Sequence, residues 1–287
     1  MKLSQFILTI LVAAGVGFVS AQYFAPSNSV EVSSQKKSVY DRVVNSGKIR
    51  CGYAIWPPYM LKDPNTGALS GINFDTMEVM GKLLGVEIEW SEETSWGTAI
   101  EGLNTDRYDV FCATVWPDGV RSKQATQSIP AFYSAIYGYT REGDTRFDGN
   151  IQRANQDDIT ISSLEGDMTH SISITEFPEA KHLVNPQLND GSTLIQDVIT
   201  KKADIIFVDE GVVSDFHANN KDRLRKVKDI DPIRVFGEVY AVKKGEFQLK
   251  NMIDTTLTTM INSGSIDRLV RKYDNSYFLP QRNYQTK

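Results

Sequence analysis

Short apolar runs alternate along the chain with stretches in which apolar residues recur every three or four positions. The runs predict buried strands, and the recurring positions predict amphipathic helices. After residue 45 the expected order is strand, helix, strand, helix, strand, at residues 49–54, 73–85, 86–90, 96–103 and 108–114, with Asn73 as the N-cap of the first helix. The last of these strands is almost continuously apolar, as is typical of strands buried on both faces of a parallel sheet.

A second unit of similar construction follows. Strands are predicted at 159–162 and 203–208 with a helix at 193–200 between them, and a strand at 238–243 precedes two helices broken at Gly264. Alternating strands and helices imply parallel sheets with right-handed crossovers. We therefore predict an α/β protein with two lobes.

The N-terminus has the layout of a secretory signal peptide. Lys2 precedes the almost entirely apolar run from Phe6 to Val19, which is short for a membrane span. We favour a cleaved signal over residues 1–21, and an uncleaved anchor and a buried helix remain the alternatives. Residues 22–44 include a polar, serine-rich stretch and are predicted to be a flexible lead-in.

Composition narrows the class of protein. The chain has 287 residues, of which 41% are hydrophobic and 23% charged, and this excludes collagen-like, coiled-coil and low-complexity proteins. The net charge of −5 argues against a nucleic-acid partner, since binding phosphates requires a basic surface.

The histidines and cysteines are too few and too scattered for a structural zinc site, so we expect no metal and no cofactor. They are His170, His182, His217, Cys51 and Cys112. Each cysteine lies in a predicted strand, and an exported protein favours a disulfide. A bridge requires the two strands to be adjacent, with both side chains on one face. The alternative is a pair of buried thiols.

Candidate binding residues follow the predicted strands. In open α/β sheets, ligands bind beyond the carboxyl ends of the strands. Those ends carry two tryptophans, a cation and an anion, namely Trp56, Trp116, Arg121 and Asp209. Aromatic faces together with separate positive and negative groups suit a small zwitterion.

Six segments, taken in order and with their spacing, resemble the bacterial extracellular solute-binding proteins of family 3, the amino-acid-type periplasmic binding proteins of ABC importers. The segments are residues 48–61, 70–90, 95–110, 121–133, 202–210 and 264–274. The resemblance covers about residues 45–280. It implies the type II periplasmic-binding fold, in which two crossover strands join two lobes that close on the ligand by a hinge. Lobe 1 would then comprise 45–131 plus 237–287, and lobe 2 would be 132–236.

The resemblance also implies roles for two charged residues. Arg121 stands where the family holds the α-carboxylate of the ligand, and a guanidinium fits a carboxylate with two charge-assisted hydrogen bonds. The alternative is a solvated surface arginine. Asp209 stands where the family contacts the α-ammonium. Asp209 could equally cap a helix over Glu210–Asn219, and the two roles are compatible.

Aromatic and turn residues complete the implied site. Trp56 and Trp96 match the positions that flank the ligand side chain, although core packing is the alternative for both. Asp167, Met168 and Thr169 occupy the place of a Gly-Thr-Thr-like turn at a helix start, where backbone N–H groups bind an anion. Asp167 departs from that pattern and would either oppose an anion or favour a cationic ligand group.

Two further candidate ligand-binding residues depart from the family pattern. Trp116 replaces a threonine that commonly binds the ligand, and Thr114 stands where glycine is frequent. These departures leave the carboxylate anchor in place and alter recognition of the ligand side chain.

We therefore expect a periplasmic, monomeric solute-binding protein without catalytic residues. It would capture a small zwitterion, expected to be an amino acid, and deliver it to the membrane permease of an ABC importer. One alternative is a periplasmic enzyme resembling cyclohexadienyl dehydratase. An enzyme requires a general acid or base in the cleft, and the candidates are Glu210, Asp167 and Glu93. No paired-carboxylate arrangement is visible in the sequence. The other is a membrane-tethered ligand sensor.

Overall fold

The computed structural model describes residues 38–186, 191–220, 223–273 and 277–280, so the predicted signal peptide lies outside the described residues. The predicted lead-in over 22–44 is too long at its C-terminal end, because Val39–Ser46 forms helix α2. Ser38 caps this helix by accepting a hydrogen bond from the Asp41 amide, and Val39 and Val43 are buried. Among the described helices, none has the length and apolar character of a membrane span.

The N-terminal half of the described chain contains a parallel three-stranded layer. Strand β1 (Lys48–Tyr53) lies between β4 (Glu87–Glu93) and β5 (Val110–Val115) and is parallel to both. Helices α3 (Ile72–Leu84) and α4 (Ala99–Asn104) connect these strands. A short hairpin of β2 (Leu61–Lys62) and β3 (Leu69–Ser70) precedes α3.

Helix α3 begins one residue before the predicted cap. Its cap position is Gly71, whose φ of 116° is a conformation that side chains rarely adopt. Asn73 is buried inside the first turn instead. Its amide donates to Thr114 and its carbonyl accepts from the Tyr240 hydroxyl, at 3.2 Å each.

A second parallel layer is formed by β8 (Thr160–Leu164), β9 (Lys181–Asn185) and β10 (Ile205–Asp209). Its helices are α5 (Met168–Glu176), α6 (Gly191–Ile199) and α7 (Glu210–Asn219). The 3-10 turns are η1 (Arg121–Lys123) and η2 (Ile151–Ala154).

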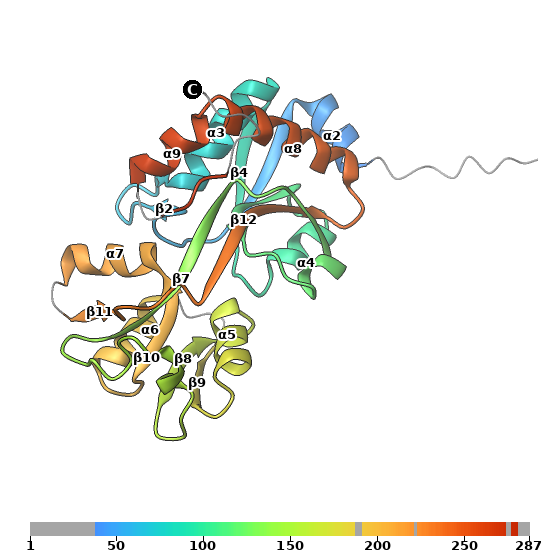
Figure 1. Cartoon of the computed structure of the whole chain (residues 1–287). Coiled ribbons are helices and arrows are strands. Elements are labelled where there is room, and N and C mark those ends of the chain that lie inside the picture. The colour runs from blue at the N-terminus through green and yellow to red at the C-terminus, as the bar shows by residue number, and fades with distance from the viewer. Residues whose placement is uncertain (1–37, 187–190, 221–222, 274–276, 281–287) are drawn as a thin grey trace, which may run out of the picture. The chain divides into compact units, whose positions relative to one another are not determined.

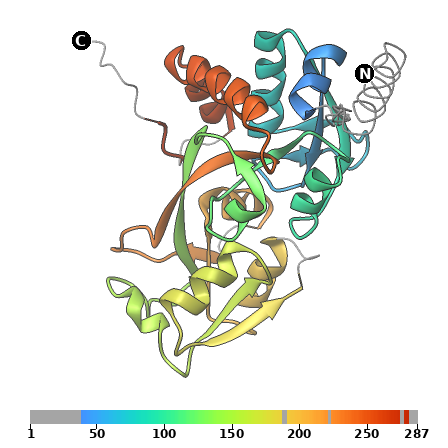
Figure 2. The same cartoon turned by 90° about the vertical axis from the view of Figure 1, so that its right-hand side faces the viewer.

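Two ten-residue strands, β7 (Phe132–Arg141) and β12 (Arg234–Lys243), connect the layers (Figures 1 and 2). They are antiparallel to each other. Strand β12 continues along β5, and β7 continues along β10. The result is one ten-stranded sheet, in which β6 (Ala125–Gln127) and β11 (Leu224–Lys226) pair with β12 and β7. The mixed α/β class with two crossover strands is therefore confirmed.

The C-terminal helices return to the first layer. Helices α8 (Phe247–Asn262) and α9 (Ser265–Tyr273) pack with α3 (Figure 1). Buried apolar residues from 39–132 and 239–277 form the core clusters on this side, and residues 136–227 form those on the other. On this ground we propose the lobe boundaries given above.

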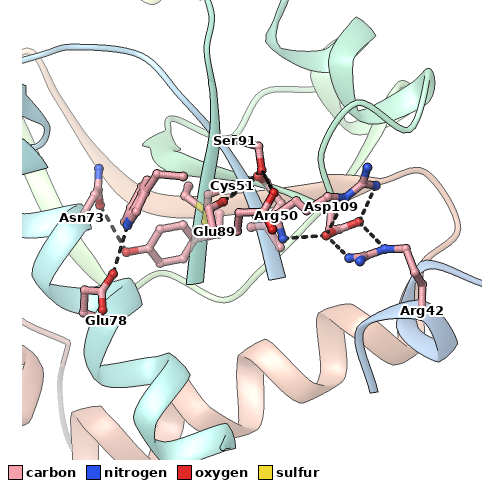
Figure 3. Close-up of a disulfide and its surroundings, with 12 residues drawn as sticks. Arg42, Arg50, Cys51, Asn73, Glu78, Glu89, Ser91 and Asp109 are labelled. Carbon is pink, nitrogen blue, oxygen red and sulfur yellow. Dashed lines mark hydrogen bonds and ion pairs between the residues drawn. A yellow bond between two sulfur atoms is a disulfide. The ribbon is translucent and has the colours of Figure 1, made fainter. Parts of the chain in front are cut away.

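Cys51 of β1 and Cys112 of β5 are joined by a disulfide, with a Cα–Cα distance of 5.4 Å (Figure 3). Both cysteines are fully buried in the core of the first layer. The adjacent-strand condition is met, and the bridge is the correct one of the two alternatives.

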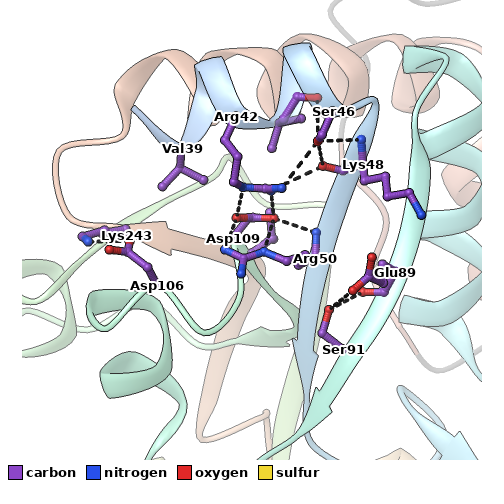
Figure 4. Close-up of polar contacts among 12 residues, drawn as sticks. Val39, Arg42, Ser46, Lys48, Arg50, Glu89, Ser91, Asp106, Asp109 and Lys243 are labelled. Carbon is purple, nitrogen blue, oxygen red and sulfur yellow. Dashed lines mark hydrogen bonds and ion pairs between the residues drawn. The ribbon is translucent and has the colours of Figure 1, made fainter. Parts of the chain in front are cut away.

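Asp109 is a buried carboxylate placed between two arginines (Figure 4). Arg42 of α2 contacts it from one side, and Arg50 of β1 donates to it through both its backbone amide (2.7 Å) and its guanidinium (2.9 Å). The three groups tie α2, β1 and the start of β5 together.

Candidate functional site

A cavity that is partly open to solvent lies where the two layers face each other. The lining residues follow β1 and β4, lie at the end of β5 or just after it, follow β8, end β10, or belong to β12. They are Trp56, Tyr59, Trp96, Thr114, Val115, Trp116, Arg121, Asp167, Met168, Asp209 and Glu238.

Eight of the nine residues predicted from the sequence line this cavity, and Thr169 does not. Thr169 is buried, and its hydroxyl accepts a hydrogen bond from the Leu164 amide at 3.1 Å. It therefore fastens the start of α5 to the end of β8. Asp167 caps the same helix by accepting from the Thr169 amide, which keeps it at the cavity wall.

Arg121 reaches the cavity from the turn after β5. Its backbone amide donates to the Asp118 carboxylate at 2.7 Å. Its guanidinium donates to the Trp116 carbonyl oxygen and lies 3.3 Å from the Asp118 carboxylate. These contacts hold the guanidinium at the cavity instead of leaving it a freely solvated surface group, since its side chain is only 21% exposed.

Asp209 ends β10 and caps α7, which is one of the two roles considered for it, and it also lines the cavity. Its Oδ1 accepts from the Gly211 and Val212 amides at 3.0 and 3.4 Å. Its Oδ2 is buried, and among the described residues no group meets it in hydrogen-bond geometry. Burial and the nearby Glu238 carboxylate raise the pKa of Asp209 to about 7, against smaller lowering effects of Trp56 and the two amides.

The two layers approach each other closely beside this carboxylate. A Cβ on Gly211 would lie 2.2 Å from the Tyr277 hydroxyl and 2.5 Å from Pro58. Only glycine therefore allows α7 to meet these residues of the first layer. The Tyr277 hydroxyl also reaches Asp209 Oδ1, at 3.5 Å.

Glu238 is the principal lining residue that the sequence reading missed. It lies on the crossover strand β12 and is 2% exposed. Its Oε1 accepts hydrogen bonds from Trp116 Nε1 (2.7 Å), Ser134 Oγ (2.7 Å) and the Tyr59 hydroxyl (3.3 Å). Burial raises the pKa of Glu238, and these donors oppose that effect. The available signal was a single acid directly before the apolar run from Val239 to Val242.

The structure also corrects the expectation that no paired carboxylates are present. Asp209 and Glu238 line one cavity, and the Glu238 carboxylate contributes to the raised pKa of Asp209. Of the three acid–base candidates named from the sequence, only Asp167 lines the cavity. Glu210 binds Lys226 and Glu93 binds Lys62, in partly exposed ion pairs.

Aromatic side chains form the remaining walls. Trp56 and Trp96 meet edge to face, with ring centroids 5.9 Å apart. Trp56 also packs against core clusters of both layers, so cavity lining and core packing hold together. Trp116 stacks on Phe236 at 4.9 Å while its indole N–H points to Glu238. Such walls supply apolar area and attract cations.

Within the described parts of the chain, no cluster of three or more metal-ligating side chains occurs. The charged groups of the cavity are one arginine and three carboxyl groups. The arginine can bind a carboxylate, and the acids can bind ammonium or guanidinium groups. The cavity is therefore suited to binding a small charged ligand.

The family model of the bacterial extracellular solute-binding proteins, family 3, matches residues 49–276. The chain belongs to this family. The match spans both layers, both crossover strands and every residue that lines the cavity. The resemblance inferred from the six segments is thereby confirmed. No curated protein matches the chain.

Solved structures of similar fold include the ancestral amino acid-binding protein AncCDT-1, a precursor of cyclohexadienyl dehydratase. It has a TM-score of 0.71 and 21% identity, and the similarity covers 83% of this chain and 99% of that one. An amino acid ABC transporter substrate-binding protein from Streptococcus pneumoniae, bound to L-arginine, has a TM-score of 0.70 and 19% identity, covering 81% and 97%. A putative ABC transporter binding component from Wolinella succinogenes, complexed with lysine, has a TM-score of 0.71 and 21% identity, covering 80% and 97%. At these identities the likeness establishes the fold.

Proposed function

We propose that this family 3 solute-binding protein captures a free amino acid and delivers it to the membrane permease of an ABC importer. The observation that carries the proposal is the presence of Arg121 and Asp209 in the lining of one cavity, each provided by a different layer. Family membership supports the binding role, and the ligands of the similar solved structures, arginine and lysine, support an amino acid.

In this mechanism the α-carboxylate of the ligand binds the Arg121 guanidinium, and its α-ammonium binds the unpartnered Oδ2 of Asp209. The side chain of the ligand lies between the Trp56–Trp96 pair and Trp116. Because the ligand contacts both layers, its binding stabilises the closed arrangement, and β7 and β12 provide the hinge. The permease then recognises the closed form.

The remaining assignments follow from this role. We propose that residues 1–21 are a signal peptide that is cleaved on export to the periplasm, and that the protein acts there as a monomer. The buried disulfide supports an oxidising compartment. Mass spectrometry of the exported protein tests the cleavage, because retention of Met1 would instead indicate a membrane tether.

A thermal-shift screen of the twenty amino acids tests the binding role. Ligand at about 1,000-fold excess over Kd stabilises the native state by about 4 kcal/mol. We expect Arg121→Ala to weaken the best ligand by about 100-fold or more, because the ligand carboxylate then loses its charged partner. The matched control is Arg153→Ala, which removes an exposed guanidinium paired with Asp158 and should leave binding unchanged. Full binding by the Arg121 variant would refute the anchor.

A second candidate function is an enzyme on the same fold, and one observation favours it. A buried carboxyl group with a pKa of about 7, beside a second acid, is suited to general acid–base catalysis. Proton NMR of each bound compound over hours would reveal any product. We expect none, and turnover abolished by Asp209→Asn would replace the transport role with a catalytic one.

A further inference from the structure

We propose that Glu238 makes the site selective for amino acids that carry a second positive charge, and that Trp116 positions Glu238 for this purpose. The inference rests on the proposed amino-acid-binding role and names the ligand class within it. That class is an α-amino acid whose side chain ends in an ammonium or guanidinium group.

The charges of the cavity are not balanced by an ordinary zwitterion. The cavity is lined by one basic residue, Arg121, and by three acidic residues, Asp167, Asp209 and Glu238. The carboxylate and ammonium of a neutral amino acid match Arg121 and Asp209, which leaves Glu238 and Asp167 without a cation. A cationic side chain supplies the missing positive charge.

In the part of the chain that the structure describes, no lysine, arginine or histidine neutralises the two buried acids of the cavity. Among the described residues, neither Glu238 nor Asp209 makes an ion pair with a lysine, arginine or histidine. The cavity's own arginine is already engaged with Asp118 and with the Trp116 carbonyl oxygen. A buried carboxylate without a cationic partner is unfavourable, and a ligand that brings the cation gains the difference.

The setting of Glu238 is that of a fixed acceptor. Its hydrogen-bond donors, on Trp116, Ser134, Tyr59 and Thr114, are all neutral, so they orient the carboxylate without cancelling its charge. Trp116 is clamped in turn by its stacking on Phe236 and by a hydrogen bond from Nε1 to Ser134 Oγ at 2.9 Å. A fixed, buried anion discriminates charge better than a mobile one, because little reorganisation accompanies binding.

Titration calorimetry with arginine and citrulline on the purified full chain tests the proposal. The two amino acids share a backbone and a chain length, but citrulline carries a neutral urea in place of the guanidinium. The native protein should bind arginine at least about 10-fold more tightly, and Glu238→Gln should reduce arginine affinity by about 10- to 100-fold while changing citrulline affinity by less than about 3-fold. Lysine and norleucine provide a second pair of the same design.

Two further variants separate the roles. Glu210→Gln is the control, because it removes a neighbouring acid that pairs with Lys226 outside the cavity, and it should leave the arginine-to-citrulline ratio unchanged. Trp116→Phe keeps an aromatic ring against Phe236 and deletes the N–H donor. It should lower the ratio by about 3- to 10-fold, an effect that a purely structural change would not confine to the charged ligand.

The outcomes divide cleanly. Equal binding of arginine and citrulline by the native protein, with both lost in Arg121→Ala, overturns the role of Glu238 and leaves the amino-acid-binding role intact. Absence of binding by any amino acid overturns both. If Glu238→Gln does not fold, the native ratio and the Trp116→Phe ratio still decide the matter, since a ratio near one in the native protein or an unchanged ratio in Trp116→Phe contradicts the proposal.

Discussion

Two buried acidic centres of this protein differ in whether positively charged side chains neutralise them. Asp109 is fully buried and is contacted by Arg42 and Arg50. Asp209 and Glu238 are equally buried, at 1% and 2% exposure, and no described cation pairs with them. The first centre is complete within the chain, whereas the second has a deficit that a ligand can fill.

The contrast explains what each centre contributes. The arginines of Asp109 come from α2 and β1, so the contacts hold secondary-structure elements together (Figure 4). The acids of the cavity lie on β10 and β12, where burial raises both pKa values and the Glu238 carboxylate adds to the rise at Asp209. The Asp109 centre therefore supports folding, and the cavity acids trade stability of the ligand-free protein for affinity.

The largest effect on stability is expected from removing the disulfide between Cys51 and Cys112. The disulfide joins β1 and β5 across a sequence separation of 61 residues (Figure 3). Replacing both cysteines by serine should lower the free energy of unfolding by about 4 kcal/mol, because the unfolded chain regains the freedom of that loop. Urea unfolding of the oxidised protein and the double variant measures the difference. A loss below about 1 kcal/mol would show that the bridge is not a main constraint on this region.

A smaller loss should follow Asp109→Ala. The substitution leaves two arginines without their partner and the Arg50 amide without its acceptor. We expect a destabilisation of about 3 kcal/mol, at the low end for a broken buried ion pair because both guanidiniums are about a third exposed and can reach water. Asp158→Ala, which breaks an exposed pair with Arg153, is the matched control and should change much less. Equal effects in urea unfolding would remove the distinction drawn for Asp109.

Measured over a single pH unit, the smallest effect is the pH dependence that belongs to the cavity acids. Because the pKa of Asp209 rises from 3.8 to about 7 on folding, the folded protein holds a proton that the unfolded chain has already released. The free energy of unfolding should therefore fall as pH rises from about 4 to about 7, by at most about 1.4 kcal/mol per pH unit for this group, and level off above.

Asp209→Asn removes that titration and should reduce the slope in this window, whereas Asp158→Asn should retain it. Urea unfolding of the ligand-free proteins at several pH values provides the measurement. A stability that rises with pH across the window in the native protein would contradict a raised pKa at Asp209.

Sequence patterns predicted most of the fold because its strands and helices carry strong periodicity. The buried run that ends at Asp209 and the helix capped by it lie where the sequence places them, as β10 and α7. The crossover strand β7 came only from family resemblance, because Phe132–Arg141 mixes apolar, hydroxyl and glycine positions without a clear period. Asn73 was misread as a cap because its polar side chain is satisfied by distant partners, Thr114 and Tyr240.

The site was predictable where a residue follows a strand end, as Arg121, Trp116 and Asp209 do. Glu238 lies inside a strand, and an acid there reads as a solvent-facing position unless the partners that bury it are known. Those partners, Trp116, Ser134 and Tyr59, are between 104 and 179 residues away in the sequence. Thr169 was wrongly placed in the cavity lining. The sequence around it does not show whether its hydroxyl faces the cavity or, as in the structure, accepts a hydrogen bond from the Leu164 amide at the end of β8.

The two oxygens of Asp209 have separate duties, one at the start of α7 and one toward the cavity. A substitution at this position therefore disturbs a helix and a binding contact together. Homologues that evolve a different ligand specificity would accordingly be expected to keep this aspartate and to change the residues around it. Adaptive change would concentrate at cavity positions that do not also cap a helix, such as Glu238 and Trp116.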